Sequence, residues 1–372
     1  MKKILIVFGT RPEAIKMSPL VKEFLVNSQH FDTKVCVTAQ HREMLDQVLN
    51  FFEVKPDYDL NLMKPGQNLF ELTSDVIKGM KKILEEFKPD FVFVHGDTTT
   101  STSAALAAFY AGSKVCHVEA GLRTFNKKSP FPEEMNRQIT GRLADFHFAP
   151  TSTSIKNLLS EGVDEKTIYE VGNSVIDALL WAKEKLSSYE DEEITFLKKM
   201  INFDKKIILV TGHRRENFGE GFLNICSALL EVAKRDEVEI IYPVHLNPQV
   251  QQPVYDMLSK HPNIKLIKPL SYPAFVWLMN KSYIILTDSG GVQEEAPSLG
   301  KPVLVMRDTT ERPEAVDAGT VKLVGTNKEY IVDQLNYLLN NEEVYYNMSK
   351  SNNPYGDGFT CSKIVSILKE NG

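Results

Sequence analysis

The sequence predicts an α/β protein made of two doubly wound domains of parallel sheet. Short apolar runs rich in β-branched residues alternate with longer amphipathic runs along nearly the whole chain. The apolar runs are continuous, which indicates strands buried on both faces, as in parallel sheets covered by helices. At 372 residues the chain is too long for one ordinary core. We therefore expect two domains that face a central cleft, with ligands at the carboxyl ends of the strands.

The strand candidates are short, and amphipathic runs such as 69–87 and 100–111 lie between them as expected helices. In the first half the strands are expected at 4–8, 34–38, 91–95, 115–118, 146–149 and 168–171. The second half repeats the rhythm at 207–211, 239–244, 264–267, 283–286, 303–306 and 321–323. We place the first domain at 1–172 and the second at 173–355.

The overall composition argues against several classes of protein. The chain is 42% hydrophobic and 25% charged with a formal net charge of −6, so no global field attracts nucleic acid or an anionic membrane. The apolar run at 4–8 is too short for a signal-peptide core, and no apolar stretch approaches transmembrane length. We expect a cytoplasmic protein whose four widely spaced cysteines, which form no CxxC pair, are buried free thiols.

The most informative motif is TDSGGVQEEAPSLGKPVLVMRDTTERPEA, which begins at a strand end. The Ser-Gly-Gly turn at 289–291 lets a ligand approach the backbone closely, and the first amides of a helix expected at 292–299 favour phosphate. Glu294 and Glu295 are expected in the first turn of that helix, where a sugar hydroxyl suits them better than phosphate. Arg312 returns a cation to the same edge, so the motif indicates a nucleotide grip. An ordinary capped turn is the alternative.

Cations and a short acid follow two other expected strands. After the first strand the chain reads GTRPEAIK, with Pro12 expected at the first helical position and Arg11 and Lys16 near the strand end. The GK[ST] ending of a Walker loop is missing, and a capped helix with solvated charges is the alternative. After the strand at 91–95, Asp97 is well placed for proton transfer, although the residues alone favour an N-cap role for it.

A cluster of acids follows the strand at 115–118. Glu119 comes directly after that strand, and Glu133 and Arg137 lie on a later segment. In a cleft the pKa values of such acids can be pushed apart, so that one donates a proton and another accepts it. The alternative is a simple pair of Glu133 with Arg137 at i, i+4 on one helix face.

The second half supplies groups suited to an anionic leaving group. Gly-His-Arg-Arg follows the strand at 207–211, and His213 can donate to a phosphate oxygen as a bond breaks. His245 follows the next strand, where a lone histidine is more often structural. Phe275 and Trp277 could stack on a base, but aromatic residues at helical spacing more often belong to the core.

Together these residues resemble the non-hydrolysing UDP-N-acetylglucosamine 2-epimerases, and the likeness extends over nearly the whole chain. It rests on the ordered motifs FGTRPEAIKMSPL, AQHREM, HGDTTT, HVEAGLRT, PFPEEMNRQ, TGHRREN, PVHLNP and TDSGGVQEEAPSLGKPVLVMRDTTERPEA. The resemblance implies the GT-B fold, in which two Rossmann-like domains face a central cleft and the nucleotide lies mainly on the second. It also implies that the last helix, within 356–372, packs back on the first domain.

The resemblance further implies roles for individual residues. The catalytic group consists of Asp97, Glu119, Glu133, His213 and Lys16. The substrate-binding group consists of Arg11, Phe275, Ser289, Gly290, Glu295 and Arg312, with Glu295 on the ribose hydroxyls and Phe275 near the uracil. A second UDP-N-acetylglucosamine, which activates several bacterial members, would lie at Gln40, His41, Gln67, Glu133, Arg137, Arg214 and His245.

The implied reaction is reversible epimerisation at C2 of UDP-N-acetylglucosamine (UDP-GlcNAc). UDP is eliminated to leave 2-acetamidoglucal, and its re-addition gives UDP-N-acetylmannosamine (UDP-ManNAc) for surface polysaccharide synthesis. The resemblance implies a homodimer with UDP-GlcNAc and UDP as ligands. We expect no cofactor, no metal, and neither nucleic acid nor a membrane as a partner.

Three other functions stay open on the sequence. A GT-B glycosyltransferase would need a cleft open to an acceptor, and usually one base rather than clustered acids. A hydrolysing epimerase would release free ManNAc together with UDP. A non-catalytic sensor would bind UDP-GlcNAc without exchanging any proton, and the presence of the acids argues against it.

Overall fold

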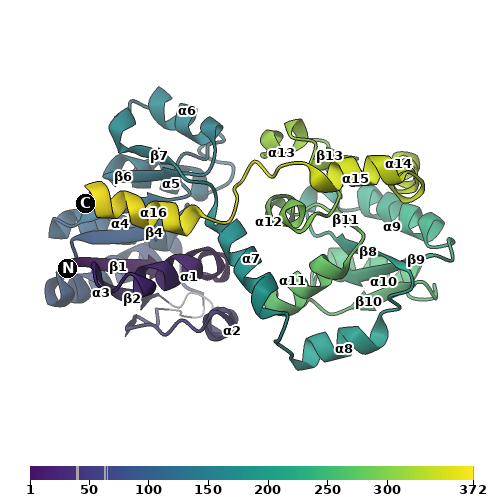
Figure 1. The fold of residues 1–372 in the computed structure, drawn as a ribbon, viewed down its shortest axis with the longest axis horizontal. Helices are drawn as coiled ribbons and strands as arrows, with labels where there is room; N and C mark the ends of the chain where they lie inside the picture. The colour runs from purple at the N-terminus through teal and green to yellow at the C-terminus, as the bar shows by residue number, and fades with distance from the viewer. Residues whose placement is uncertain (39–41, 63, 65, 372) are drawn as a thin grey trace. The chain divides into compact units, whose positions relative to one another are not determined.

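The computed structural model describes residues 1–38, 42–62, 64 and 66–371. The chain divides into two compact units (Figure 1). The N-terminal unit comprises Met1–Trp181 together with Tyr355–Gly372, and the C-terminal unit comprises Ala182–Pro354. The first limit between the units falls inside helix α7 (Ser174–Lys185), later in the chain than the boundary at 172 that the strand pattern suggested.

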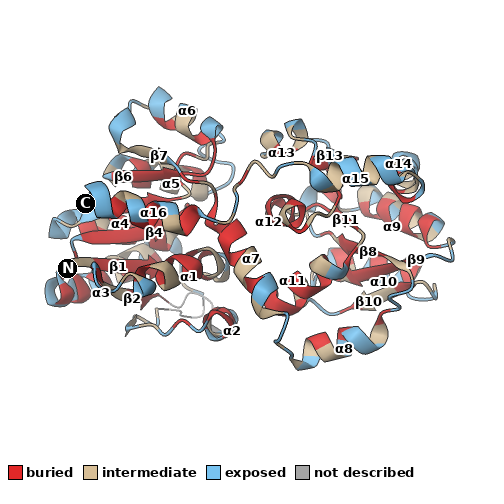
Figure 2. Ribbon diagram, in the orientation of Figure 1, coloured by how far each residue is buried: buried red, intermediate tan, exposed pale blue. Residues whose placement is uncertain are grey.

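The described residues of the N-terminal unit form a seven-stranded parallel sheet in the order β3-β2-β1-β4-β5-β6-β7. The strands are β1 (Lys2–Phe8), β2 (Phe31–Val37), β3 (Tyr58–Asp59), β4 (Phe91–His95), β5 (Lys114–Val118), β6 (Phe146–Ala149) and β7 (Ile168–Glu170). Every residue of β4 is buried, as a continuous apolar run in a covered parallel sheet should be (Figure 2).

The helices of the N-terminal unit begin at side chains that cap them. Thr10, Asn68 and Thr98 each accept a hydrogen bond from a backbone N–H of the first helical turn. The helices are α1 (Arg11–Val26), α2 (Arg42–Phe52), α3 (Leu69–Phe87), α4 (Thr99–Ala111), α5 (Glu133–Leu143), α6 (Ser152–Ser160), the first part of α7, and α16 (Thr360–Asn371).

The described residues of the C-terminal unit form a six-stranded parallel sheet in the order β10-β9-β8-β11-β12-β13. The strands are β8 (Lys206–Thr211), β9 (Val238–Pro243), β10 (Ile264–Ile267), β11 (Ile284–Thr287), β12 (Val303–Val305) and β13 (Val321–Leu323). The helices are α8 (Glu192–Met200), α9 (Glu220–Val232), α10 (Pro248–Leu258), α11 (Tyr272–Lys281), α12 (Gly290–Glu295), α13 (Pro313–Asp317), α14 (Lys328–Asn340) and α15 (Glu342–Lys350).

Each sheet has one point at which the strand order reverses. In the N-terminal unit the chain moves outward from β1 through β2 and β3, then returns to place β4 on the other side of β1. In the C-terminal unit the reversal lies between β8 and β11. The loops that leave two strands at such a point diverge, and ligands bind in the crevice outside their carboxyl ends. The loops after β1, β4, β8 and β11 are therefore the ones placed for binding.

Helix α16 belongs to the N-terminal unit and packs against α1 (Figure 1). Lys2 Nζ donates to the carbonyl of Leu368 at 2.7 Å. The carboxylate of Asp177, in α7, accepts the backbone N–H groups of Thr360 at 3.3 Å and Cys361 at 2.8 Å. Because these amides belong to the first turn of α16, Asp177 compensates donors that the helix itself leaves unpaired.

The two parallel sheets confirm the expected fold class, and most strands were predicted to within a few residues. The strands at 91–95, 146–149, 264–267 and 321–323 have the predicted limits. Strand β3 was not predicted, because a strand of two residues carries no hydrophobic pattern. Pro12 is the second residue of α1 and not the first, since Thr10 is the N-cap.

The four cysteines are buried and free, as predicted. Burial raises the pKa of the Cys36 thiol to about 12, which suppresses the reactive thiolate. In the part of the chain that the structure describes, no helix has the length and apolar character needed to span a bilayer.

Gly121 is the glycine at which we expect a side chain to cost the most stability. Its φ is +93°, and an added Cβ would lie 2.8 Å from the carbonyl carbon of Ser154. Gly121→Ala should lower the free energy of unfolding by about 1–2 kcal/mol for the left-handed backbone and by about 1–3 kcal/mol more for the clash. Gly162→Ala is the matched control, because φ is +77° there but a Cβ meets nothing within 4 Å. Equal losses in urea denaturation of the two variants would contradict the clash.

Candidate functional site

The site residues predicted from the sequence gather at the carboxyl ends of strands in both units. The N-terminal unit carries a set that we call the acid cluster, made of Lys16, Asp97, Glu119 and Arg137. Its members come from α1, from the loops after β4 and β5, and from α5. The strands β1, β4 and β5 are neighbours in the sheet, which brings these separate segments to one edge.

Glu119 lies directly after β5 and forms an ion pair with Lys16. Its Oε2 also accepts a hydrogen bond from Asn173 Nδ2 at 2.9 Å and lies 3.8 Å from His95 Nε2. Burial opposes ionisation of Glu119, but Lys16, His95 and Asn173 outweigh it and lower its pKa to about 2. The residue has φ of +62°, an uncommon conformation outside glycine. Such a held, ionised carboxylate at a strand end is typical of a functional site.

Asp97 faces a different cation. Its Oδ2 accepts two hydrogen bonds from Arg137, one of them from Nε at 3.1 Å. Burial raises the pKa of Asp97, and the nearby charge of Glu119 raises it further, although Arg137 opposes both effects. The N-cap of α4 is Thr98, which accepts the N–H of Ser101 at 3.0 Å, so the N-cap role favoured for Asp97 is wrong. Its side chain is left to interact with α5.

The two carboxylates therefore have pKa values moved in opposite directions. The pKa of Asp97 is shifted up, in part by the charge of Glu119, and the pKa of Glu119 is shifted down. Two carboxylates whose pKa values are moved apart suit a reaction in which one delivers a proton and the other removes one.

Glu134, in α5, holds the backbone segment at 124–125 that precedes this helix. Its fully buried carboxylate accepts the backbone N–H groups of Thr124 at 2.9 Å and Phe125 at 3.1 Å, and it pairs with Arg137 Nη1 at 3.0 Å. The pair of Glu133 with Arg137 that the spacing allowed is thus replaced by pairs of Arg137 with Asp97 and Glu134. Glu133 begins α5, and its Oε2 is buried without a hydrogen-bond partner in the described chain.

Glu13 is a further residue of this edge that the sequence interpretation missed. Its buried carboxylate accepts the N–H groups of Gly9 at 3.0 Å and Thr10 at 2.8 Å. The other oxygen accepts the hydroxyls of Thr98 at 2.6 Å and Ser101 at 2.9 Å. Glu13 therefore ties the loop after β1 to the loop after β4. The capping-box spacing of Thr10 and Glu13 was the signal in the sequence, but it indicates only the first of these loops.

The second group lies in the C-terminal unit, in the loops after β8 and β11. His213 and Arg214 follow β8, and the buried Asp288 follows β11. Asp288 Oδ2 accepts the N–H groups of His213 and Arg214, each at 2.8 Å. The imidazole of His213 is stacked on that of His245, with ring centroids 5.2 Å apart. The structure thus brings together two histidines that the sequence placed on different strands.

We call a third set of residues, Ser289, Gly290, Glu294 and Arg312, the glycine turn. Its first residue directly follows Asp288 in the sequence. Helix α12 begins at Gly290 with Ser289 as its N-cap residue, earlier than predicted, and no acid lies in its first turn. The expectation that Glu294 and Glu295 lie in the first turn of this helix is therefore wrong. Arg312 Nε donates to Glu294 at 2.7 Å. Its guanidinium covers Gly290, since a Cβ there would lie 2.6 Å from Arg312 Cζ.

The remaining predicted residues are distributed over both units. Phe275 is half-buried in α11. Trp277 is buried and contacts Phe203 edge-on, so it has the core role that was the alternative to stacking on a base. Gln67 Nε2 donates a hydrogen bond to the carboxylate of Asp75 at 3.3 Å. Arg11 is half-buried at the start of α1. Gln40 and His41 lie outside the described residues.

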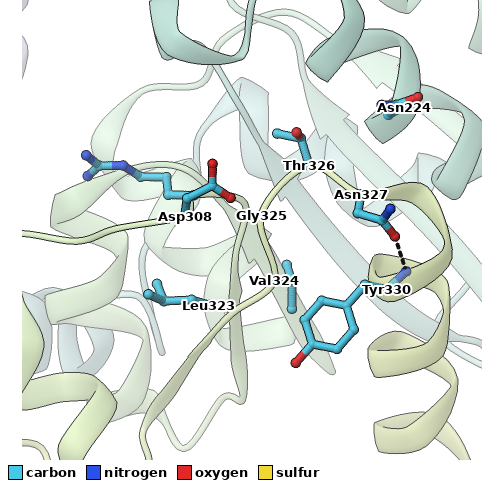
Figure 3. Close-up of a pocket in the computed structure, with 9 residues that line it drawn as sticks. Asn224, Asp308, Leu323, Val324, Gly325, Thr326, Asn327 and Tyr330 are labelled. Atoms are coloured by element: carbon cyan, nitrogen blue, oxygen red, sulfur yellow. Dashed lines mark hydrogen bonds between the residues drawn. The ribbon is translucent and has the colours of Figure 1, made fainter.

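A cavity of about 550 Å³ lies elsewhere in the C-terminal unit, after β12 and β13 (Figure 3). Asp308, Gly325 and Asn327 line it, and none of the predicted site residues does. The Asn327 side chain accepts the N–H of Tyr330 at 2.8 Å and caps α14. Arg307, also in the lining, pairs with Glu216 and Glu311. The side chains of Asn327 and Arg307 are thus engaged in local structure.

Comparison with known proteins relates nearly the whole chain to one family. A family model described as UDP-N-acetylglucosamine 2-epimerase matches residues 24–369. The UDP-N-acetylglucosamine 2-epimerase of Escherichia coli K12 is 59% identical to this chain over 372 residues, which cover 99% of each chain.

Solved structures show the same likeness in three dimensions. The UDP-GlcNAc 2-epimerase from Neisseria meningitidis, bound to UDP-GlcNAc, is 53% identical with a TM-score of 0.87, over 99% of this chain and 100% of that chain. The enzyme from Methanocaldococcus jannaschii, in complex with UDP-GlcNAc and UDP, is 34% identical with a TM-score of 0.79 over the same shares. The likeness spans both units and all the loops described above.

Proposed function

The chain belongs to the UDP-N-acetylglucosamine 2-epimerase family, and we propose that it interconverts UDP-GlcNAc and UDP-ManNAc by eliminating UDP and adding it back. The observation that carries this mechanism is the acid cluster. Asp97 lies close enough to Glu119 for that charge to help raise its pKa, whereas the pKa of Glu119 is lowered. A reaction that removes a proton from one face of a carbon and returns one to the other needs two such groups.

The chemistry of the substrate requires C1 to react before C2 can lose a proton. The hydrogen on C2 is not next to a carbonyl, so its direct removal would be very slow. Cleavage of the anomeric C1–O bond sends its electron pair to UDP and builds positive charge at C1, which acidifies the C2 hydrogen. A carboxylate then takes that proton, and 2-acetamidoglucal and UDP remain. Protonation of C2 from the opposite face and attack of UDP at C1 complete the epimerisation.

We assign the proton transfers to Asp97, Glu119 and Glu133. Glu119 is supported as the member that is ionised before the reaction by its contacts with Lys16 and Asn173. Asp97 is supported as the member that can hold a proton by its raised pKa. Glu133 starts α5, one turn before Arg137, and its buried oxygen has no partner among the described residues. Each positioned acid or base of this kind contributes roughly 10²–10⁴ in rate.

We assign UDP to the C-terminal unit. The Arg312 guanidinium over Gly290 suits a phosphate oxygen, and Glu295 follows on the same short helix to accept ribose hydroxyls. His213 and Arg11 stabilise the charge that develops on the diphosphate as it leaves, and Phe275 lies near the uracil. The Neisseria and Methanocaldococcus relatives were solved with UDP-GlcNAc or UDP bound, which supports the same ligands here.

Three further features are proposed from the family resemblance. A second UDP-GlcNAc would bind as an activator at Gln67, Glu133, Arg137, Arg214 and His245, together with Gln40 and His41. In that case Arg137 serves both Asp97 and the activator, because it already bonds to the Asp97 carboxylate. The protein would act as a cytoplasmic homodimer that supplies UDP-ManNAc for surface polysaccharide synthesis.

The products formed from UDP-GlcNAc alone test the proposed function. Incubation without an acceptor should give UDP-ManNAc up to a fixed ratio. The same ratio should be reached from UDP-ManNAc to which a trace of UDP-GlcNAc, the proposed activator, is added. Free ManNAc in stoichiometric amount would instead identify a hydrolysing epimerase. A requirement for an acceptor would identify a glycosyltransferase, and binding without any product would identify a sensor.

A further inference from the structure

The loops after β8 and β11 meet at the strand-order reversal of the C-terminal unit. Thr211 and Thr287 are register partners at the ends of these parallel strands, and their hydroxyls lie 2.6 Å apart. The next residue of each loop is therefore also close to the other strand. Asp288 N donates to the carbonyl of Thr211 at 3.1 Å, which fixes the Asp288 backbone beside the segment that leads to His213.

One oxygen of Asp288 holds the loop after β8. Oδ2 accepts the N–H groups of His213 and Arg214 at 2.8 Å each and lies 3.4 Å from Asn217 Nδ2. Asn217 Nδ2 is also 3.1 Å from the carbonyl of Met306. These contacts give Oδ2 a complete structural role, and a carboxamide oxygen in the same place would serve it equally well.

The other oxygen of Asp288 has no such role. Oδ1 is fully buried, and among the described residues it makes no hydrogen bond. It lies 3.5 Å from Nδ1 of His213. A buried carboxylate oxygen is costly to leave unmatched, so it strongly favours a donor or a positive charge at that ring nitrogen. Asp288 needs its negative charge for His213 and not for the loop.

His213 is otherwise in surroundings that oppose its charge. Burial lowers its pKa, and the neighbouring His245 and Arg214 lower it further, while Asp288 acts in the opposite direction. The ring of His245 is stacked on that of His213 at an interplanar angle of 19°. The His213 side chain is 43% exposed, so part of it is accessible to a ligand, while Nδ1 faces Asp288.

We propose that Asp288 is a positioning residue that accepts a hydrogen bond from Nδ1 of His213, so that the imidazolium presents Nε2–H to the departing diphosphate. The inference rests on the proposed function for the identity of that ligand. The carboxylate fixes the ring orientation and stabilises the cation against His245 and Arg214, without touching the substrate. The same division of roles, with a buried carboxylate behind a working histidine, is used by hydrolytic triads.

The substitution Asp288→Asn separates the two oxygens. Three N–H donors surround Oδ2, so the carboxamide should place its oxygen there and direct its NH₂ group at Nδ1 of His213. The ring then loses its anionic acceptor, and Nδ1 must present a lone pair. We expect the pKa of His213 to fall by about one unit, the lower end of the effect of an adjacent opposite charge, because the ring is partly exposed.

Two readouts follow from that fall. In ¹H–¹⁵N NMR titration of the free protein, the His213 ring should titrate about one unit lower in Asp288→Asn than in the wild type. In the pH profile of kcat/KM, the limb at which activity is lost with rising pH should move to lower pH by the same amount. Above both pKa values the share of imidazolium, and with it kcat/KM, should fall roughly tenfold.

Asn217→Ala is the matched control, because it removes a contact to Oδ2 and Met306 but leaves Oδ1 opposite His213. It should lower stability without moving the His213 titration. In a His213→Asn background, Asp288→Asn should have no further effect on kcat/KM. An unchanged His213 titration in a folded Asp288→Asn protein would overturn the inference even if the enzyme epimerises normally. Failure of the wild type to form UDP-ManNAc would instead count against the proposed function, and the NMR titration would still judge Asp288.

Discussion

Asp97→Asn should lower kcat for epimerisation by roughly 10²–10⁴ while leaving the affinity for UDP close to that of the wild type. The substitution keeps the size of the side chain and an acceptor for Arg137, and Asn136 Nδ2 bonds to the backbone carbonyl of residue 97, which is unchanged. The loop should therefore keep its shape. What is lost is the ability of the carboxyl group to gain and release a proton, which the raised pKa of Asp97 indicates.

Steady-state kinetics and calorimetric titration with UDP check this prediction together. Asp236→Asn is the matched control, because it makes the same chemical change at an exposed position of the C-terminal unit. It should leave kcat and the Kd for UDP unchanged. Near-wild-type turnover of Asp97→Asn would remove Asp97 from the mechanism. Loss of UDP binding in parallel with kcat would mean that the variant is damaged more widely.

Gly290→Ala should weaken UDP binding roughly 10- to 100-fold, because it displaces the guanidinium that the proposed function places on the diphosphate. The added Cβ would lie 2.6 Å from Arg312 Cζ, and the flexible arginine side chain must move away. Hydrogen bonds to charged groups contribute about 1.5–3 kcal/mol each, which corresponds to this range of Kd. The fold should survive, because the clash is with the end of a side chain.

The adjacent glycine supplies the control for this prediction. A Cβ at Gly291 would meet Glu295 Oε2 at 3.7 Å, an ordinary van der Waals distance. Gly291→Ala adds the same methyl group to the same short helix and should change the Kd for UDP much less than Gly290→Ala. Calorimetric titration of both variants measures the difference. Equal losses would show that the glycine turn does not act through Arg312.

The placement of the functional loops could be predicted from the sequence because parallel strands buried on both faces are continuous apolar runs. The strand at 91–95 was predicted with its observed limits, and that alone puts Asp97 at a strand end. The N-cap of α4 could not be predicted, because Asp and Thr both cap helices. The choice depends on Arg137, which is 40 residues away in sequence and occupies the Asp97 carboxylate.

Long-range contacts also explain what the sequence could not reveal about the other acids. Glu13 and Glu134 look like ordinary first-turn acids, and only the fold shows Glu13 bonded to hydroxyls of the β4 loop and Glu134 bonded to the backbone at 124–125. In the sequence Asp288 looks like the last residue of a strand, yet its carboxylate accepts the backbone N–H of His213 and so holds that loop. In each case these partners lie in the segment that follows another strand, so no local sequence pattern encodes the contact.

If this enzyme breaks and remakes the C2–H bond of UDP-GlcNAc, the hydrogen at C2 should exchange with solvent, and that exchange tests the mechanism most directly. The enzyme should be incubated with UDP-GlcNAc in D₂O and the sugar followed by NMR at C2. The mechanism predicts deuterium at C2 of UDP-ManNAc and also of recovered UDP-GlcNAc, since the reaction runs in both directions. Formation of UDP-ManNAc without deuterium at C2, or complete absence of exchange in a protein that binds UDP-GlcNAc, would contradict it.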